Sequence, residues 1–75
     1  MTRVNKVLQY LSEHASSPGR AMDRADILND LSAAGTMSQF YRKRLAYEDA
    51  ITWVVTYYRH IKTDEMGRIY MAVAN

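Results

Sequence analysis

The fold of this chain is decided by the stretch Tyr47-Glu-Asp-Ala-Ile-Thr-Trp-Val-Val-Thr-Tyr-Tyr-Arg-His60 and by the segment that follows it at once, Ile61-Lys-Thr-Asp-Glu-Met-Gly-Arg-Ile-Tyr-Met-Ala-Val73. At about 100° per residue, the apolar side chains of the first segment cover an arc of roughly 200°, so neighbours should pack on two sides of this helix. In the second segment, every second residue from Ile69 to Val73 is apolar, as in a half-buried strand, after a loop from Asp64 to Gly67. The sequence therefore predicts a helix that leads directly into a β-hairpin, with Ile69 and Val73 packed on the helix face at 51–55.

Further helices precede this pair. Thr2 can cap a first helix, which carries one apolar stripe of Val4, Val7, Leu8 and Leu11. This helix should end in the loop at 16–19, where a proline and a glycine follow two serines. A second helix should begin after Asp23 as its N-cap and end at Gly35, a left-handed C-terminal residue.

A third helix should start directly after the second, because Thr36 and Gln39 have the spacing of a capping box. We expect it to turn Leu45 inward. No helix-breaking residue follows, so either one bent helix over 37–60 or two helices that meet near Ala46 would satisfy the pattern. We favour two helices.

Length and composition set the class of protein. Seventy-five residues, 48% of them hydrophobic, make a single domain over 1–75 with one small core. The absence of cysteine excludes disulfides and thiolate metal sites and suits a reducing compartment. The N-terminus lacks the apolar run of a signal peptide, and no window approaches a membrane span. We therefore expect a cytoplasmic protein without a membrane partner.

Positive charge is concentrated in the second half of the chain. Residues 1–38 carry four basic and four acidic side chains, whereas residues 39–75 carry six basic and four acidic ones. The net charge is +2, which permits nucleic-acid binding without requiring it. An anionic partner should meet the second half first.

The third helix carries a group of side chains suited to DNA. Ser38, Gln39, Arg42 and Lys43 share an arc of about 140°. Gln39 and Arg42 can each make two hydrogen bonds to a base edge in the major groove. Ser38, Lys43 and the adjacent Arg44 suit contacts to phosphates. The alternative is that Arg42, Lys43 and Arg44 only form an ordinary solvent-exposed helix face.

With its glycine in the turn and polar second helix, the segment 27–45 resembles the helix-turn-helix family. In its order of elements, the whole chain resembles the winged-helix superfamily. That resemblance implies that the hairpin is a wing on the DNA backbone or minor groove, with Lys62 and Arg68 as phosphate binders. The alternative is a hairpin that only covers the core, since the carboxylates at 64–65 would be repelled by phosphates.

No group of residues suits catalysis or a metal ion. His14 and His60 are far apart and have no ligand spacing. Asp23, Asp26 and Asp30 share one helix face, but no further ligand is placed to complete a set, so this stripe should face water or a basic protein. We expect neither an enzyme nor a cofactor nor a metal.

Aromatic side chains are abundant for so short a chain. Six tyrosines and one tryptophan exceed what a core of this size can enclose. We expect Trp53 and Tyr57, at the margin of the apolar arc, to be exposed and to form a partner interface, such as a dimer contact.

The sequence thus predicts an α+β fold, a small winged-helix-like domain of three or four helices followed by a C-terminal β-hairpin. The expected function is binding of double-stranded DNA by a compact transcriptional regulator of a mobile element, acting as a homodimer. The alternative is a protein-binding inhibitor or adaptor that uses the aromatic surface and the carboxylates of the second helix.

Overall fold

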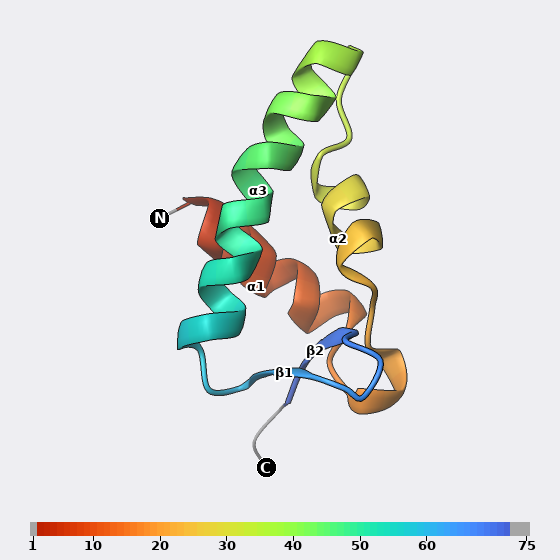
Figure 1. The fold of residues 1–75 in the computed structure, drawn as a ribbon, viewed down its shortest axis with the longest axis vertical. Coiled ribbons are helices and arrows are strands. Elements are labelled where there is room, and N and C mark those ends of the chain that lie inside the picture. The colour runs from red at the N-terminus through yellow and green to blue at the C-terminus, as the bar shows by residue number, and fades with distance from the viewer. Residues whose placement is uncertain (1, 73–75) are drawn as a thin grey trace.

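The computed structural model of the chain describes residues 2–72. Three helices precede a two-stranded antiparallel sheet (Figure 1). The elements are α1 (Thr2–His14), the 3₁₀ turn η1 (Pro18–Arg20), α2 (Arg24–Leu31), α3 (Met37–Tyr57), β1 (Ile61–Thr63) and β2 (Ile69–Met71). The prediction of an α+β fold with a C-terminal hairpin is confirmed, and the helices number three within the described residues.

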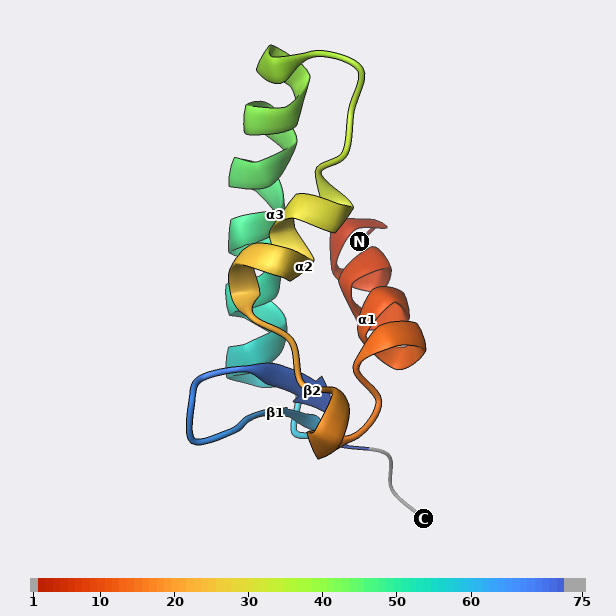
Figure 2. The same cartoon turned by 90° about the vertical axis from the view of Figure 1, so that its right-hand side faces the viewer.

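The core lies where α3 packs against α1 and α2 (Figure 2). The predicted stripe of α1 supplies buried Val4, Val7 and Leu11, and α2 supplies Ile27 and Leu28. From α3 come Tyr47, Ala50, Ile51 and Val54, and from the strands come Ile61 and Ile69. One face of each helix is thus removed from water, and that burial is the main source of stability in a chain without disulfides.

The hairpin is attached to the rest of the fold through backbone hydrogen bonds. The amide of Ile69 donates to the carbonyl of Met22 at 2.8 Å, and the amide of Met22 donates to the carbonyl of Ile69 at 2.9 Å. The amide of Met71 donates to the carbonyl of Ala15 at 2.7 Å. The segment between α1 and α2 therefore extends the sheet beside β2. The predicted burial of Ile69 is confirmed, whereas Val73 lies outside the described residues.

The hairpin turn is closed by Asp64 and Arg68. The carboxylate of Asp64 accepts bonds from the amides of Met66 and Arg68 at 3.0 and 2.8 Å, and from Nε of Arg68 at 2.9 Å. Desolvation acts to raise the pKa of Asp64, but these hydrogen bonds and the guanidinium charge together hold it below the ordinary value. Gly67 takes φ +80°, which only glycine adopts without strain. The predicted loop is confirmed.

The structure corrects the expectations for α3, for the end of α2 and for Leu45. Helix α3 is one continuous helix, where two meeting near Ala46 were favoured, and it ends at Tyr57 instead of His60. An unbroken helix keeps every backbone hydrogen bond, and no residue near Ala46 disrupts one. Helix α2 ends at Leu31, with Ser32 as its C-cap, and Gly35 does not adopt a positive φ.

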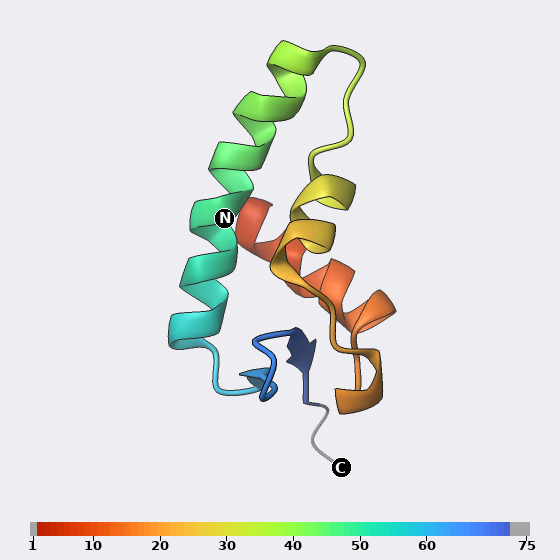
Figure 3. The same ribbon diagram turned by 45° about the vertical axis from the view of Figure 1, so that its right-hand side comes forward.

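The last correction concerns Leu45, which was expected to turn inward and is 73% exposed. The chain continues past α2 through the linker 32–36 before it turns back into α3 (Figure 3). The N-terminal part of α3 therefore projects beyond the core and has little to pack against. The N-cap is as predicted, because the hydroxyl of Thr36 accepts a bond from the amide of Gln39 at 3.2 Å.

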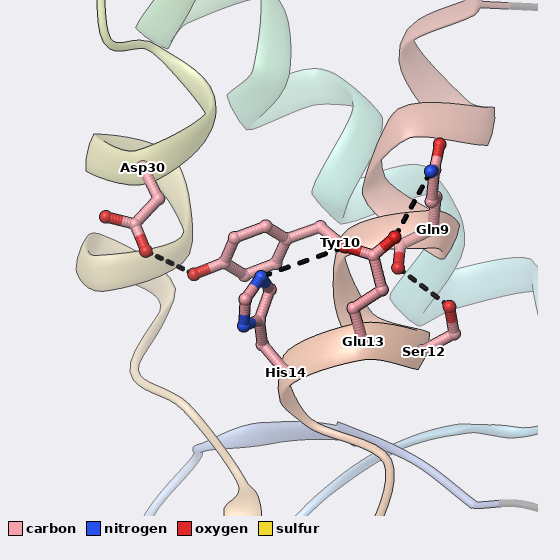
Figure 4. A network of polar contacts seen from close by, with 6 residues as sticks. All are labelled: Gln9, Tyr10, Ser12, Glu13, His14 and Asp30. Atoms are coloured by element: carbon pink, nitrogen blue, oxygen red, sulfur yellow. Dashed lines mark hydrogen bonds and ion pairs between the residues drawn. The ribbon is translucent and has the colours of Figure 1, made fainter.

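Two polar contacts fix α2 between its neighbours. Nε of Arg24 donates to the carboxylate of Glu48 at 2.6 Å, and the same guanidinium also donates to the backbone carbonyl of Glu48 at 3.0 Å. On the other side, the hydroxyl of Tyr10 in α1 donates to the carboxylate of Asp30 (Figure 4). Burial, and then the bond to Asp30, raise the pKa of Tyr10. Asp30 is thus engaged within the fold.

Within residues 2–72, no helix combines the length and the apolar character that a membrane crossing requires.

Candidate nucleic-acid interface

Four basic side chains from two helices line one hollow of about 350 Å³ on the surface. Arg3 and Lys6 come from the first two turns of α1, and Arg42 and Lys43 come from α3. Ala46 and Tyr47 of α3 form the rest of the lining. We call this the basic hollow. Its lining includes no carboxylate.

Within the part of the chain that the structure describes, the four cations of the basic hollow have no ionic partner. Among the described residues, no carboxylate lies within 4.0 Å of any of their charged atoms. By contrast, Arg24 is paired with Glu48, and Arg68 is paired with Asp64. Like charges that converge without partners repel one another, and an anion placed among them would relieve that repulsion.

The hollow continues in two directions. On one side, Lys6 and Lys43 also line a wider depression of about 370 Å³, with Glu13 and Asp30 on its wall. On the other side, Arg3 and Ala46 also line an apolar hollow of about 170 Å³, whose remaining lining is Val4, Asp49, Ala50 and Trp53. A ligand that lies along α3 can therefore pass from the basic hollow to the apolar one.

The structure brings only some of the DNA-contacting residues predicted on the third helix into the basic hollow. Arg42 and Lys43 line the basic hollow, and Ser38 and Gln39 are exposed one turn earlier on the same helix. Arg44 lies elsewhere. Its Nε donates to Oδ1 of Asn29 in α2 at 3.4 Å, so it takes no part in the basic hollow.

The hairpin cations lie far from this hollow. The hairpin occupies one end of the long axis, and the projecting start of α3 occupies the other (Figure 1). Lys62 is exposed, while the guanidinium of Arg68 is held by Asp64. The structure therefore does not unite Lys62 and Arg68 with Arg42 and Lys43 in one patch.

Sequence reasoning missed two members of the hollow, Arg3 and Lys6. Their signal is present in the sequence, because two cations three residues apart lie on one helix face. What the sequence does not give is the crossing of α1 and α3, which brings this face beside Arg42 and Lys43.

Two aromatic side chains stand beside the apolar hollow. Trp53 is 47% exposed and Tyr57 is 66% exposed, as predicted for an exposed pair. Their ring centroids are 4.5 Å apart and their planes are tilted by 49°. At about 100° per residue, Arg42, Ala46, Trp53 and Tyr57 lie within about 60° of one another around α3. The aromatic pair and Arg42 thus share one side of this helix.

No family model, curated protein or solved structure matches this chain. The geometry of its surface is therefore the basis for a proposal about function.

Metal-ligating side chains do not cluster in the part of the chain that the structure describes. The three carboxylates singled out above, Asp23 before α2 and Asp26 and Asp30 within it, are all exposed, and Asp30 also accepts a bond from Tyr10.

Proposed function

We propose that this chain is a small DNA-binding protein that holds double-stranded DNA at the basic hollow. The observation that carries this proposal is the convergence of Arg3, Lys6, Arg42 and Lys43 without a carboxylate partner among the described residues. Phosphates supply the anions that such a cluster favours, and each neutralised phosphate releases counterions. A compact domain whose activity is to occupy DNA suits a transcriptional regulator of a mobile element.

In this proposal, most cations of the basic hollow contact phosphates, whereas residues at the start of α3 contact bases. Arg3, Lys6 and Lys43 fix the position of the domain on the backbone, since phosphate contacts carry no sequence information. Gln39 and Arg42 lie on the exposed start of α3 and can reach base edges in the major groove. Because the hairpin lies at the other end of the molecule, Lys62 and Arg68 are outside this footprint.

The Lys43→Ala variant should weaken binding to all duplexes alike and lower the slope of log K against log salt by about 0.9, because one fewer phosphate is neutralised. Lys62→Ala removes the same charge from the hairpin and is the matched control. Its salt slope should equal that of the wild type. Fluorescence anisotropy with a labelled duplex at several salt concentrations measures both. Equal effects of the two substitutions would show that DNA does not select the basic hollow.

A second candidate function is binding of a protein partner, and one observation favours it. Met37, Tyr41 and Leu45 are all exposed and, at about 100° per residue, fall within about 80° of one another on the projecting part of α3. We call these three residues the apolar stripe. Its central residue, Tyr41, lies about 100° from Arg42 around the helix. Exposed apolar stripes of this kind mark protein interfaces.

The double variant Tyr41→Ser/Leu45→Ser tests this candidate. Because both side chains are exposed, the free energy of unfolding should change by less than about 0.5 kcal/mol for each substitution. If the stripe binds a second copy, sedimentation equilibrium should show a dimer for the wild type and a monomer for the variant. A wild type that stays monomeric at high concentration would exclude self-association through this stripe.

A further inference from the structure

The basic hollow and the aromatic pair form one continuous surface along α3. Arg3 and Ala46 line both the basic hollow and the apolar hollow, and Trp53 is part of the wall of the apolar hollow. Tyr57 follows one turn later, with its ring against that of Trp53. At about 1.5 Å per residue, the surface from Arg42 to Tyr57 is roughly 22 Å long, enough for several nucleotides of an extended strand.

Packing of the core does not account for the position of the aromatic pair. Trp53 is 47% and Tyr57 66% accessible to water, whereas Tyr47 on the inner side of the same helix is buried. An indole and a phenol that lie side by side at the surface form an apolar patch on which a flat ligand can stack. The exposed ring surface is therefore available for a flat, apolar partner.

Nucleobases are flat, and in a nucleic acid each base is attached to the phosphate backbone. Proteins that bind single strands combine a cationic groove for the backbone with aromatic side chains on which bases stack. Within a paired duplex the faces of the bases are covered by their neighbours, so exposed aromatic rings gain little from a blunt duplex. Unpaired bases offer a free face to Trp53 and Tyr57, while the phosphates remain at the cations.

Asp49 sets the direction in which a strand would lie. It lines the apolar hollow with Arg3 and Trp53, and it is the one carboxylate in that lining. A carboxylate repels phosphates but accepts hydrogen bonds from amino groups of bases. The backbone should therefore follow Arg3, Lys6 and Lys43, with the bases turned toward Asp49 and the rings.

We propose that this surface binds DNA at a site where a strand has unpaired bases, with phosphates at the basic hollow and one or two bases stacked on Trp53 and Tyr57. This inference rests on the proposed DNA binding and names the form of DNA that binds most tightly. A duplex with a single-stranded tail can place phosphates at the basic hollow and unpaired bases on the two rings, whereas a blunt duplex contacts only the cations.

The experiment compares a blunt duplex with the same duplex carrying a deoxycytidine tail of about six nucleotides, a length within the range of small single-strand sites. Cytosine carries the amino group that Asp49 can accept from. Tails on the 5′ and 3′ strands are tested separately. Trp53 is the only tryptophan, so its emission reports directly on stacking. One of the tailed duplexes should quench this emission and bind about tenfold more tightly than the blunt duplex, which should leave the emission nearly unchanged.

Two substitutions test whether the tenfold difference in affinity between tailed and blunt duplexes comes from the rings. With a labelled DNA and anisotropy as the readout, Trp53→Leu and Tyr57→Ala should each reduce affinity for the tailed duplex toward that for the blunt duplex. Affinity for the blunt duplex should stay within about twofold of the wild type. The matched control is Tyr41→Ala, because Tyr41 is a comparably exposed ring (57%) on another side of the same helix. It should leave both affinities unchanged.

Three outcomes would overturn the inference, and they differ in what they leave of the proposed DNA binding. Equal, salt-sensitive affinity for blunt and tailed duplexes without a change in Trp53 emission would remove the stacking role and leave the proposed DNA binding intact. A Trp53 emission that shifts with protein concentration, and not with DNA, would assign the rings to a protein interface. The absence of binding to either DNA would refute the proposed function itself.

Discussion

Replacing Ile69 with alanine is expected to lower the free energy of unfolding by about 2–4 kcal/mol, the usual range for emptying a core position. Ile69 is buried, and its backbone joins β2 both to Thr63 of β1 and to Met22 in the segment before α2. Truncation therefore leaves a cavity at the point where the hairpin meets the helices. In a domain of 75 residues this loss is a large share of the total stability.

Urea unfolding followed by far-UV circular dichroism measures this effect. The control is Met66→Ala, which truncates an apolar side chain in the turn of the same hairpin where it is exposed. Its unfolding free energy should stay within about 0.5 kcal/mol of the wild type. If Ile69→Ala is as stable as Met66→Ala, the hairpin is not part of the cooperative core.

The second large effect is expected for the triple variant Lys6→Gln/Arg42→Gln/Lys43→Gln. Hydrogen bonds to charged groups contribute about 1.5–3 kcal/mol each when they are made, so loss of three should weaken duplex binding by at least about 100-fold at low salt. The salt slope should fall by about 1.8, since Lys6 and Lys43 each contact a phosphate and about 0.9 counterions are released for each such contact. All three residues are exposed, so the fold should tolerate the change.

A second triple variant separates the basic hollow from net charge. Arg20→Gln/Arg59→Gln/Lys62→Gln removes three exposed cations elsewhere on the surface and changes the net charge by the same amount. Its salt slope should match that of the wild type. Similar losses in the two triple variants would mean that DNA responds to overall charge and not to the basic hollow.

Local sequence patterns predicted most of the fold, because they depend on neighbours within a few residues. The buried face of α1 follows from helical spacing, and the cap at Thr36 from the need of a helix start for an acceptor. The turn at 64–67 follows from its glycine, the residue that most readily adopts the positive φ found there. The continuity of α3 did not follow from such patterns. Two helices and one helix share the same periodicity, and only packing distinguishes them.

The position of Leu45 illustrates the same limit. Its apolar side chain and helical spacing indicate a core residue, but the linker 32–36 carries the start of α3 past the end of the core. Burial depends on whether another element is present on that side of the helix. The sequence contains no local sign of that absence.

The candidate site was predicted in part for a related reason. Arg42 and Lys43 are neighbours in sequence and were identified from their shared arc. Arg3 and Lys6 are about 40 residues away and join them only through the crossing of α1 and α3. Conversely, Lys62 and Arg68 were grouped with them by charge, although the hairpin lies at the other end of the molecule.

The most direct test of the central claim is the salt dependence of duplex binding by the wild-type protein. If Arg3, Lys6 and Lys43 each neutralise one phosphate, log K should fall linearly with log salt, with a slope of about −2.7. Binding should be readily measured at about 50 mM salt and much weaker at about 200 mM. A slope near zero, or no binding even at the lower salt concentration, would contradict the assignment of the basic hollow as a DNA interface.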